Sequence, residues 1–309
     1  MLKDRKILVT GPAGSIAYPL SLELAKDNEV WGVARFSHPG DEEKIQALGI
    51  TTRRIDLGVG EFGDLPDDFD YLLHIGAYIA PGSDFDAALR VNAEGTGLLM
   101  THCRKAKAAL VMSTTGVYQP HEDPWRPYLE TDPLGDSQLP GMATYGLSKI
   151  TEEAVARMCA RQLGLPTIIA RMNAAYGDGE SGHGGLPVTH FEAIRAGRPV
   201  TLRWDPSPYS PIHNRDIFDQ LPALLDAAAV PAPIVNWGGD EAVTAQDWCA
   251  YFGELLGVTP TVLVHEAPGA QRGVVADNAR RLALTGPCKV GWRDGMRELV
   301  EARLRRAGA

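Results

Sequence analysis

Residues 6–25, which read KILVTGPAGSIAYPLSLELA, decide the fold of this chain. The apolar run at 7–10 predicts a buried strand that breaks at Gly11, and a helical pattern restarts near Gly14. This order leaves free backbone N–H groups at the helix N-terminus, where a pyrophosphate can bind. The small side chain of Ala17 lets the helix pack closely against the strand. The stretch predicts a phosphate-binding turn, with a plain glycine turn as the alternative.

Length and composition narrow the class of protein. At 309 residues the chain has room for one large α/β domain with a smaller lobe. Its formal charge of −9 argues against binding to nucleic acid. The four cysteines lie far apart and the eight histidines are scattered, so neither disulfides nor a metal site is expected. No apolar run is long enough for a membrane and the first strand begins almost at once, which predicts a cytoplasmic protein without a signal peptide.

Apolar runs alternate with helical patterns, which indicates βαβ units around a parallel sheet. We predict strands at 7–10, 30–34, 52–55, 71–75, 109–112, 167–170 and 234–236. We predict helices at 84–105, 145–163, 245–256 and 293–305. The fold class is therefore α/β, a Rossmann-type doubly wound parallel sheet with a smaller C-terminal substrate lobe. The predicted dinucleotide-binding domain spans 1–176 with a return at about 211–240, and the predicted lobe spans 177–210 and 241–309.

The second strand ends in Val33-Ala34-Arg35-Phe36-Ser37, at the edge where such sheets bind ligands. A carboxylate at this point would accept hydrogen bonds from the ribose hydroxyls of NAD, but the residue here is Ala34, which has no carboxylate. Arg35 is placed to pair with a 2′-phosphate and to cover the adenine. The sequence predicts NADP as the cofactor, with NAD possible. The alternative is a solvated arginine at a strand end.

Two later strand ends complete the predicted cofactor site. Asp56 is placed to accept a hydrogen bond from the adenine amino group, with Leu57 over the ring, although a surface aspartate in a turn is the alternative. Gly76 and Ala77 are small enough for a cofactor to approach the backbone. The predicted cofactor-binding residues are Gly11, Ala13, Gly14, Ser15, Ile16, Arg35, Ser37, Asp56, Leu57, Gly76, Ala77 and Lys149.

The fifth strand leads into hydroxyl-bearing residues, and a tyrosine and a lysine follow later on a predicted helix. The spacing of Tyr145 and Lys149 puts them on one face, a turn apart. A free phenol has a pKa of roughly 10, and an adjacent ammonium lowers it toward neutral pH. Tyr145 is then able to exchange a proton with an alcohol or carbonyl oxygen held by Thr114, or by Ser113 if the register differs by one. We predict Thr114, Tyr145 and Lys149 as the catalytic residues.

These motifs together resemble those of the extended short-chain dehydrogenases/reductases, in the NAD(P)-dependent epimerase/dehydratase family. The resemblance covers nearly the whole chain, through Thr10-Gly11-x-x-Gly14-x-x-Ala17, Asp56-Leu57, His74-x-Gly76-Ala77, Val91-Asn92-x-x-Gly95-Thr96, Ser113-Thr114-x-x-Val117-Tyr118, Tyr145-x-x-x-Lys149, and Arg171 with Tyr176-Gly177. It implies a catalytic triad of Thr114, Tyr145 and Lys149 and a C-terminal substrate lobe. It also implies a homodimer joined by a four-helix bundle from the helices at 84–105 and 145–163.

Two substrate signatures of the family members that act on nucleotide sugars are altered here. Ala174 replaces an asparagine, with Asn173 displaced by one position. Tyr209 replaces an arginine, which removes a contact to a pyrophosphate worth roughly 1.5–3 kcal/mol. We therefore expect a small, partly apolar alcohol or carbonyl as the substrate. The predicted substrate-binding residues are Ser113, Tyr78, Met142, Asn173 and Tyr209.

The main hypothesis is an NADP-dependent oxidoreductase that transfers hydride between the nicotinamide and a secondary alcohol or carbonyl of a small molecule. The alternative is a nucleotide-sugar epimerase or dehydratase, in which the bound cofactor is reduced only transiently. A third hypothesis is a protein that senses NADP without turnover, and the presence of both Tyr145 and Lys149 argues against it.

Overall fold

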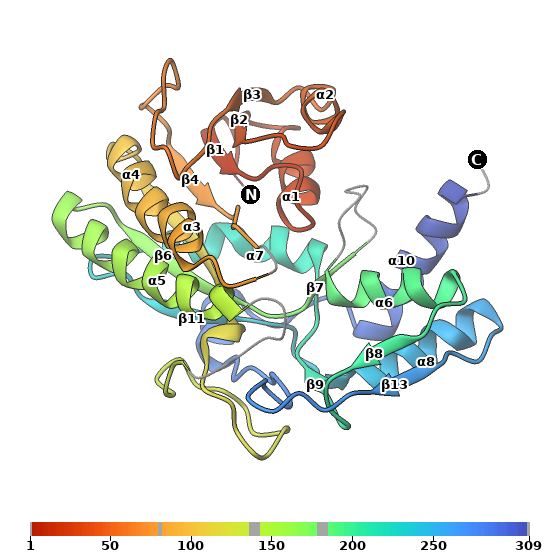
Figure 1. The fold of residues 1–309 in the computed structure, drawn as a ribbon. Helices are drawn as coiled ribbons and strands as arrows, with labels where there is room; N and C mark the ends of the chain where they lie inside the picture. Colours follow the sequence, from red (N-terminus) through yellow and green to blue (C-terminus); the bar gives the residue numbers. More distant parts are fainter. Residues whose placement is uncertain (1, 80–81, 136–142, 178–184, 308–309) are drawn as a thin grey trace.

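The computed structural model describes residues 2–79, 82–135, 143–177 and 185–307, and its centre is a sheet of seven parallel strands (Figure 1). The strands are β1 (Lys6–Thr10), β2 (Glu29–Ala34), β3 (Thr51–Arg54), β4 (Tyr71–His74), β5 (Ala108–Thr114), β6 (Thr167–Met172) and β11 (Ile234–Trp237). Their order is β11-β6-β5-β4-β1-β2-β3, and neighbouring strands are parallel throughout. The order reverses beside β1, and open α/β sheets bind ligands at such a reversal.

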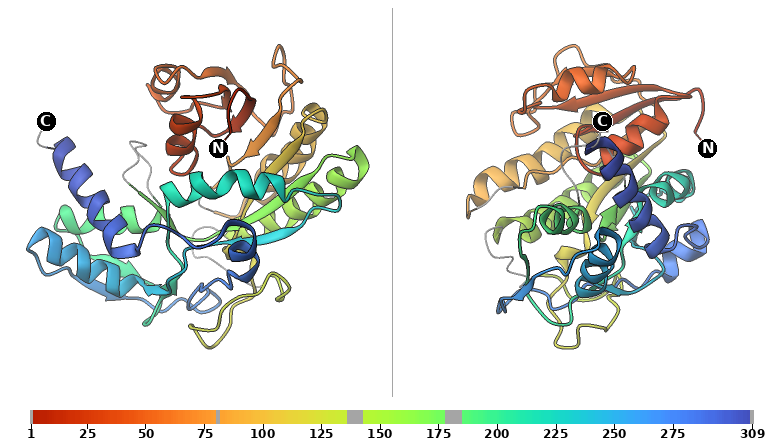
Figure 2. Two further views of the ribbon diagram at one scale, coloured as in Figure 1. Left: turned by 180° about the vertical axis from the view of Figure 1, so that it is seen from behind. Right: turned by 90° about the vertical axis from the view of Figure 1, so that its right-hand side faces the viewer.

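Helices cover both faces of the sheet, as the views in Figure 2 illustrate. On one face, α1 (Ala17–Leu24) and α7 (Asn214–Asp226) pack over a core that includes Ile7 and Val9. On the other face, α4 (Gly95–His102) and α5 (Ala143–Leu163) pack over a core that includes Leu8. Successive residues of β1 point to opposite faces and both faces are buried, which explains why the strand is apolar throughout.

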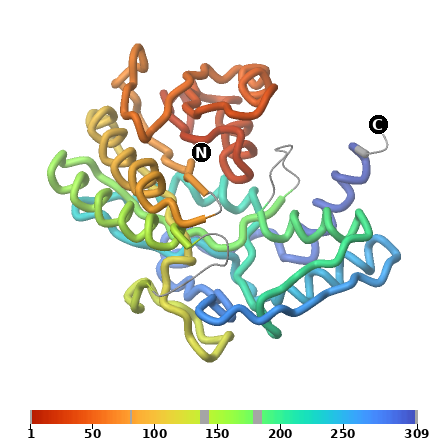
Figure 3. Tube along the Cα trace, viewed as in Figure 1, coloured from red at the N-terminus to blue at the C-terminus, as the bar shows by residue number. Residues whose placement is uncertain are grey.

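The C-terminal part of the chain forms a smaller lobe (Figure 3), and this lobe has its own apolar core. Its elements are α6 (Leu186–Arg195), β8 (Val200–Leu202), β9 (Pro208–Tyr209), β12 (Val243–Thr244), α8 (Ala245–Leu256), β13 (Val262–Val264) and α10 (Trp292–Ala307). Phe191 of α6, Trp248 of α8 and Leu299 of α10 are fully buried together in this core. Because these helices bury their apolar faces against one another, the lobe has a core distinct from the two that flank the sheet.

The remaining elements are short connections. They are α2 (Asp41–Gln46), α3 (Phe85–Leu89), the π-helix η1 (Arg90–Glu94), the 3₁₀-helix η2 (Thr115–Val117), β7 (Ala175–Tyr176), β10 (Ile212–His213) and α9 (Ala279–Thr285). Within the described ranges, no helix combines the length and apolar character needed to cross a membrane. Across the same ranges, no three histidine, cysteine, aspartate or glutamate side chains gather at a point where a metal could bind.

The predicted α/β fold, with its doubly wound parallel sheet and smaller lobe, is confirmed, and each predicted strand exists with small differences in its bounds. The helix predicted at 84–105 is confirmed from Phe85 to His102, where α3, η1 and α4 follow one another without a break, but it contains a π-helical segment and ends three residues earlier than predicted. The wide π-turn of η1 contains Asn92, whose amide is hydrogen-bonded to the backbone N–H and C=O of Tyr78. A π-turn is a single wide turn within a run that stays helical, so the helical pattern of the sequence predicts the run but not the turn.

Candidate active site

A cleft of about 650 Å³ opens at the carboxyl ends of the strands, where the strand order reverses. Ligand sites typically have volumes of about 300–1,000 Å³. Every residue predicted to bind the cofactor or to act in catalysis lines this cleft, although these residues come from distant parts of the chain. They are Gly11, Ala13, Gly14, Ser15, Ile16, Arg35, Ser37, Asp56, Leu57, Gly76, Ala77, Thr114, Tyr145 and Lys149.

The turn after β1 has a backbone that requires glycine. Gly11 has a φ of +62°, and a Cβ there would lie 2.9 Å from the Cα of Gly76. The first helical hydrogen bond runs from the N–H of Tyr18 to the C=O of Gly14 at 2.8 Å. Among the described residues, none accepts a hydrogen bond from the N–H groups of Ser15 and Ile16 at the start of α1. Exposed amides at a helix N-terminus fit an anionic phosphate group.

Arg35 and Tyr78 lie together at the β2 end of the cleft. The guanidinium carbon of Arg35 is 5.8 Å from the centre of the Tyr78 ring, and the Arg35 side chain is exposed. Ala34, the last residue of β2, brings no carboxylate to this point. The structure therefore places Tyr78, which was predicted to bind the substrate, beside a residue predicted to bind the cofactor.

The three predicted catalytic residues meet at the other end of the cleft. Thr114 is the last residue of β5, and Tyr145 and Lys149 lie one turn apart on α5, which packs against β5. Burial raises the pKa of the Tyr145 phenol, while the charge of Lys149 and a hydrogen bond with Thr114 lower it. The net shift is upward. The expected effect of Lys149 is present, but burial outweighs it in the protein alone.

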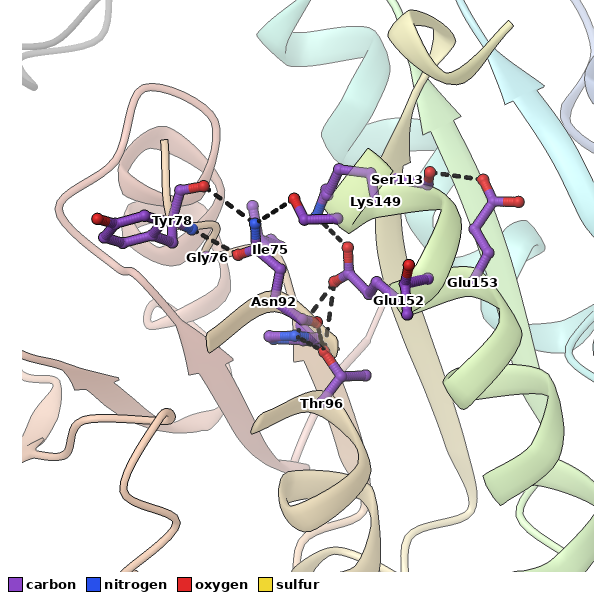
Figure 4. Close-up of polar contacts among 12 residues, drawn as sticks. Ile75, Gly76, Tyr78, Asn92, Thr96, Ser113, Lys149, Glu152 and Glu153 are labelled. Atoms are coloured by element: carbon purple, nitrogen blue, oxygen red, sulfur yellow. Dashed lines mark hydrogen bonds and ion pairs between the residues drawn. The ribbon is translucent and has the colours of Figure 1, made fainter. Parts of the chain in front are cut away.

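Glu152 belongs to this site and is absent from the sequence-based prediction. It forms an ion pair with Lys149, and both side chains are at most 2% exposed (Figure 4). Its charge raises the pKa of Tyr145. The sequence does carry a signal, since an acid three residues after a lysine lies on the same helical face. Only the fold shows that this face is buried.

Two predicted substrate residues line the cleft but are engaged within the protein. The Ser113 hydroxyl donates a hydrogen bond to Oε1 of Glu153 at 2.6 Å. The Nδ2 group of Asn173 donates to the C=O of Val274 at 2.7 Å, and its Oδ1 accepts from the N–H of Ser210 at 3.0 Å. These bonds hold separate segments together at the edge of the cleft, and the substrate roles of Ser113 and Asn173 stay predictions.

Of the other two predicted substrate residues, Tyr209 lies in the lobe and Met142 falls outside the described residues. Tyr209 on β9 pairs with Val243, and its ring centre lies 5.4 Å from that of Trp248 in the lobe. It is not one of the described residues that line the cleft.

Several solved structures with the same fold are epimerases of nucleotide sugars. The UDP-glucuronic acid 4-epimerase from Bacillus cereus, in complex with UDP-glucuronic acid and NAD, is 22% identical with a TM-score of 0.82, over 97% of this chain and 99% of that one. The UDP-N-acetylglucosamine 4-epimerase from Methanobrevibacter ruminantium M1, in complex with UDP-N-acetylmuramic acid, is 18% identical with a TM-score of 0.79, over 99% and 100%. At these identities the likeness shows a shared fold.

Comparison at the level of sequence gives the family. An uncharacterized UDP-glucose epimerase, YtcB, of Bacillus subtilis (strain 168) is 25% identical over 188 residues, which are 56% of this chain and 57% of that protein. The match thus spans little more than half the length of that relative. The model of the NAD dependent epimerase/dehydratase family matches residues 7–233, from the first strand to a point beyond Lys149. Because this match covers most of the chain, the protein belongs to the NAD dependent epimerase/dehydratase family, as its motifs predicted.

Proposed function

We propose that this protein is an enzyme that uses a bound nicotinamide dinucleotide to epimerise a sugar carried on a nucleoside diphosphate. The observation that carries the proposal is that Tyr145 and Lys149 line the same cleft as the turn at Gly11, beside the hydroxyl of Thr114. Membership of the family and a fold shared with UDP-sugar 4-epimerases over nearly the whole chain support epimerisation over the oxidoreductase reaction that the sequence favoured.

In this proposal the chain supplies proton transfer and alignment. The chemistry that a nicotinamide dinucleotide supplies when bound is the reversible acceptance of a hydride. Tyr145 takes the proton of the substrate hydroxyl and later returns it to the same oxygen. Thr114 holds this oxygen by a hydrogen bond. Lys149, whose charge lowers the pKa of Tyr145, stabilises the phenolate.

We propose NADP as the preferred form of the cofactor. Ala34 at the end of β2 brings no negative charge that would repel a 2′-phosphate, and the exposed guanidinium of Arg35 follows it along the cleft. The UDP-glucuronic acid 4-epimerase from Bacillus cereus is in complex with NAD, so NAD is the alternative. A comparison of the binding of NAD and NADP distinguishes the two.

A second candidate is an NADP-dependent oxidoreductase that acts on a small alcohol or carbonyl. Tyr209 is the observation that favours it, because nucleotide-sugar enzymes of this type are expected to carry an arginine there. The ring of Tyr209 packs against Trp248 and offers no charge to a pyrophosphate.

Turnover of nucleotide sugars tests the proposal. Purified protein is incubated with UDP-glucose, UDP-glucuronic acid or UDP-N-acetylglucosamine, each with NAD or NADP. We expect one sugar to be converted to its epimer with no net reduction of the cofactor, and deuterium on the reacting carbon to stay in the product because the hydride is returned. If no sugar yields an epimer and a simple alcohol reduces NADP in equal amount, the second candidate replaces the proposal.

We also propose a homodimer formed through α4 and α5. Leu98 of α4 is 45% exposed, and Leu147 and Met158 of α5 are 46% and 53% exposed. Such large apolar side chains on a helix pair suit a two-fold interface with a second copy of the chain. Light scattering should give twice the chain mass of 33.3 kDa, and Met158→Glu should shift the protein toward the monomer. A wild-type monomer would exclude this assembly.

A further inference from the structure

A buried row of polar side chains begins with Lys149 and Glu152 (Figure 4) and continues through His74 to Thr10, which precedes the phosphate turn. The proposed reaction leaves most of this row without a role. Lys149 and Glu152 of α5 form an ion pair in which both side chains are nearly inaccessible. On the far side of this pair, Oε1 of Glu152 lies 3.3 Å from Nε2 of His74 and 3.4 Å from Oγ1 of Thr96. Glu152 is therefore enclosed between α5, β4 and α4.

The protonation of this row follows from Thr10 at the end of β1. Its Oγ1 accepts hydrogen bonds from the N–H groups of Ile75 at 3.0 Å and Gly76 at 2.8 Å, which occupy both lone pairs. Its own hydrogen is then donated to Nδ1 of His74, 2.9 Å away. His74 is therefore a neutral ring with its hydrogen on Nε2, which lies 2.7 Å from Oγ1 of Thr96.

Among the described residues, Glu152 has one close donor, the ammonium of Lys149. Its contacts with His74 and Thr96 are longer, because the Nε2–H group of His74 lies 2.7 Å from Oγ1 of Thr96 and the Thr96 hydroxyl donates to the C=O of Asn92 at 2.5 Å. Since an ammonium can only donate, Glu152 is the acceptor in the ion pair with Lys149. Its negative charge balances the buried charge of Lys149, which would otherwise lie unpaired in the protein interior.

The other charged groups on the elements packed against α5 are paired with other residues or exposed to solvent in the described structure. Arg171 of β6 is bound to Glu153, Asp86 of α3 pairs with Arg90 of η1 at the surface, and Glu94 is exposed. His102 of α4 is hydrogen-bonded to the C=O of Pro66. Tyr145 therefore has two charged neighbours of opposite sign, Lys149 and Glu152, with the Thr114 hydroxyl as a third contact.

We propose that Glu152 is a positioning residue that anchors the ammonium of Lys149 beside Tyr145 and offsets part of its charge, so that Glu152 sets the pH at which the phenol exchanges its proton. The inference rests on the proposed function, in which Tyr145 is the acid and base. It extends that function by making the proton affinity of Tyr145 depend on a pair of charges in place of a single lysine.

Glu152→Gln tests the inference, because it keeps the size of the side chain and an acceptor oxygen but removes the charge. The protein is labelled with carbon-13 at the ζ carbon of tyrosine and titrated without cofactor, and the resonance of Tyr145 is identified by its loss in Tyr145→Phe. The midpoint of this titration should fall by about one pH unit in Glu152→Gln, since the uncompensated ammonium favours the phenolate. A midpoint that stays in place or rises overturns the inference.

Glu153→Gln is the matched control. It removes a buried carboxylate one residue along the same helix, but this carboxylate is paired with Arg171. The Tyr145 midpoint should therefore move less than in Glu152→Gln, and an equal shift would contradict a specific role for Glu152. If circular dichroism shows that Glu152→Gln does not fold, Glu152→Asp replaces it as the test, because its side chain is one methylene shorter and the carboxylate lies farther from Lys149. The midpoint should then shift in the same direction by less, and no shift refutes the inference.

The two proposals fail separately. The titration needs neither cofactor nor substrate, so a shifted midpoint supports the role of Glu152 even if no nucleotide sugar is converted. In the loaded enzyme, the acidic limb of the rate profile should move with the Tyr145 midpoint. If nucleotide sugars are epimerised but Glu152→Gln leaves both the midpoint and this limb unchanged, the inference fails and the proposed function stands.

Discussion

The buried ion pair between Arg171 and Glu153 is expected to hold α5 on the sheet. Arg171 on β6 donates two hydrogen bonds to the carboxylate of Glu153 on α5, at 2.8 and 2.7 Å. The two side chains are 2% and 5% exposed. Burial alone would lower the pKa of Arg171, but the hydrogen bonds and charge of Glu153 outweigh it and raise the pKa. Arg171→Met removes the cation and leaves a buried carboxylate with the Ser113 hydroxyl as its remaining donor.

We expect Arg171→Met to lower the free energy of unfolding by about 3–5 kcal/mol, the usual cost of leaving one buried charge without its partner. In urea unfolding followed by circular dichroism, with a slope of about 3 kcal/mol per molar, the midpoint should fall by about 1–2 M. The catalytic rate should fall as well, because α5 carries Tyr145 and Lys149.

The double variant Arg171→Met/Glu153→Met is the control for this prediction. It leaves no unpaired charge. Besides the bonds within the pair, it loses the hydrogen bonds to the Ser113 hydroxyl and to the C=O of Glu130, and the contact of the Arg171 guanidinium with the Tyr118 ring, whose centre is 4.8 Å away. Two such bonds are worth about 1 kcal/mol each, so the double variant should be more stable than Arg171→Met alone. A loss below about 1 kcal/mol in Arg171→Met, or a double variant as unstable as the sum of its parts, would refute the reasoning.

Three further predictions concern the active site and the lobe. Tyr145→Phe should lower the rate of epimerisation by about 10²–10⁴-fold while the cofactor still binds, and a near-normal rate would remove Tyr145 as the acid and base. Arg35→Ala should weaken binding of NADP by about 10- to 100-fold in calorimetry with little effect on NAD, and equal losses would mean that Arg35 does not contact the 2′-phosphate. Burial lowers the pKa of His190 from 6.5 to about 4, and its Nδ1 accepts a hydrogen bond from Trp248. Between these two pKa values the unfolded chain binds a proton at His190 that the folded protein does not bind. The free energy of unfolding should therefore be highest above about pH 6.5 and fall as the pH falls toward 4, with a loss of about 2 kcal/mol at about pH 5. Urea unfolding of His190→Gln should lack this part of the pH dependence, and an unchanged dependence would exclude His190 as its source.

The gathering of the predicted catalytic and cofactor residues in one cleft could be foreseen because their signals are local. A glycine turn after an apolar run, and a tyrosine and a lysine one turn apart, depend on short stretches of chain whose geometry the backbone dictates. In a parallel sheet the carboxyl ends of all strands lie at the same edge. The residues that follow the predicted strands are therefore expected to lie together at this edge. This rule brought Gly11, Arg35, Asp56, Gly76 and Thr114 together correctly.

The contacts of the predicted substrate residues could not be predicted from the sequence, because segments distant in the chain provide them. Ser113 is held by Glu153 on α5, and Asn173 is held by Ser210 and Val274. Tyr209 packs within the lobe core. Comparison with the family pattern identifies which residue is altered. The neighbours of that residue depend on how the lobe packs against the sheet.

The sequence by itself determined the strands, the phosphate turn and the pair Tyr145 and Lys149, because hydrophobic period and helical spacing act over a few residues. The tertiary structure alone decided the strand order, the π-turn at Asn92 and the partner of Lys149. Glu152 meets His74 only because α5 packs against β5, which is the neighbour of β4 in the sheet, and burial then strengthens the interactions of the two side chains. Charge pairing in an interior is a property of the packed fold, since the same groups in water would interact weakly.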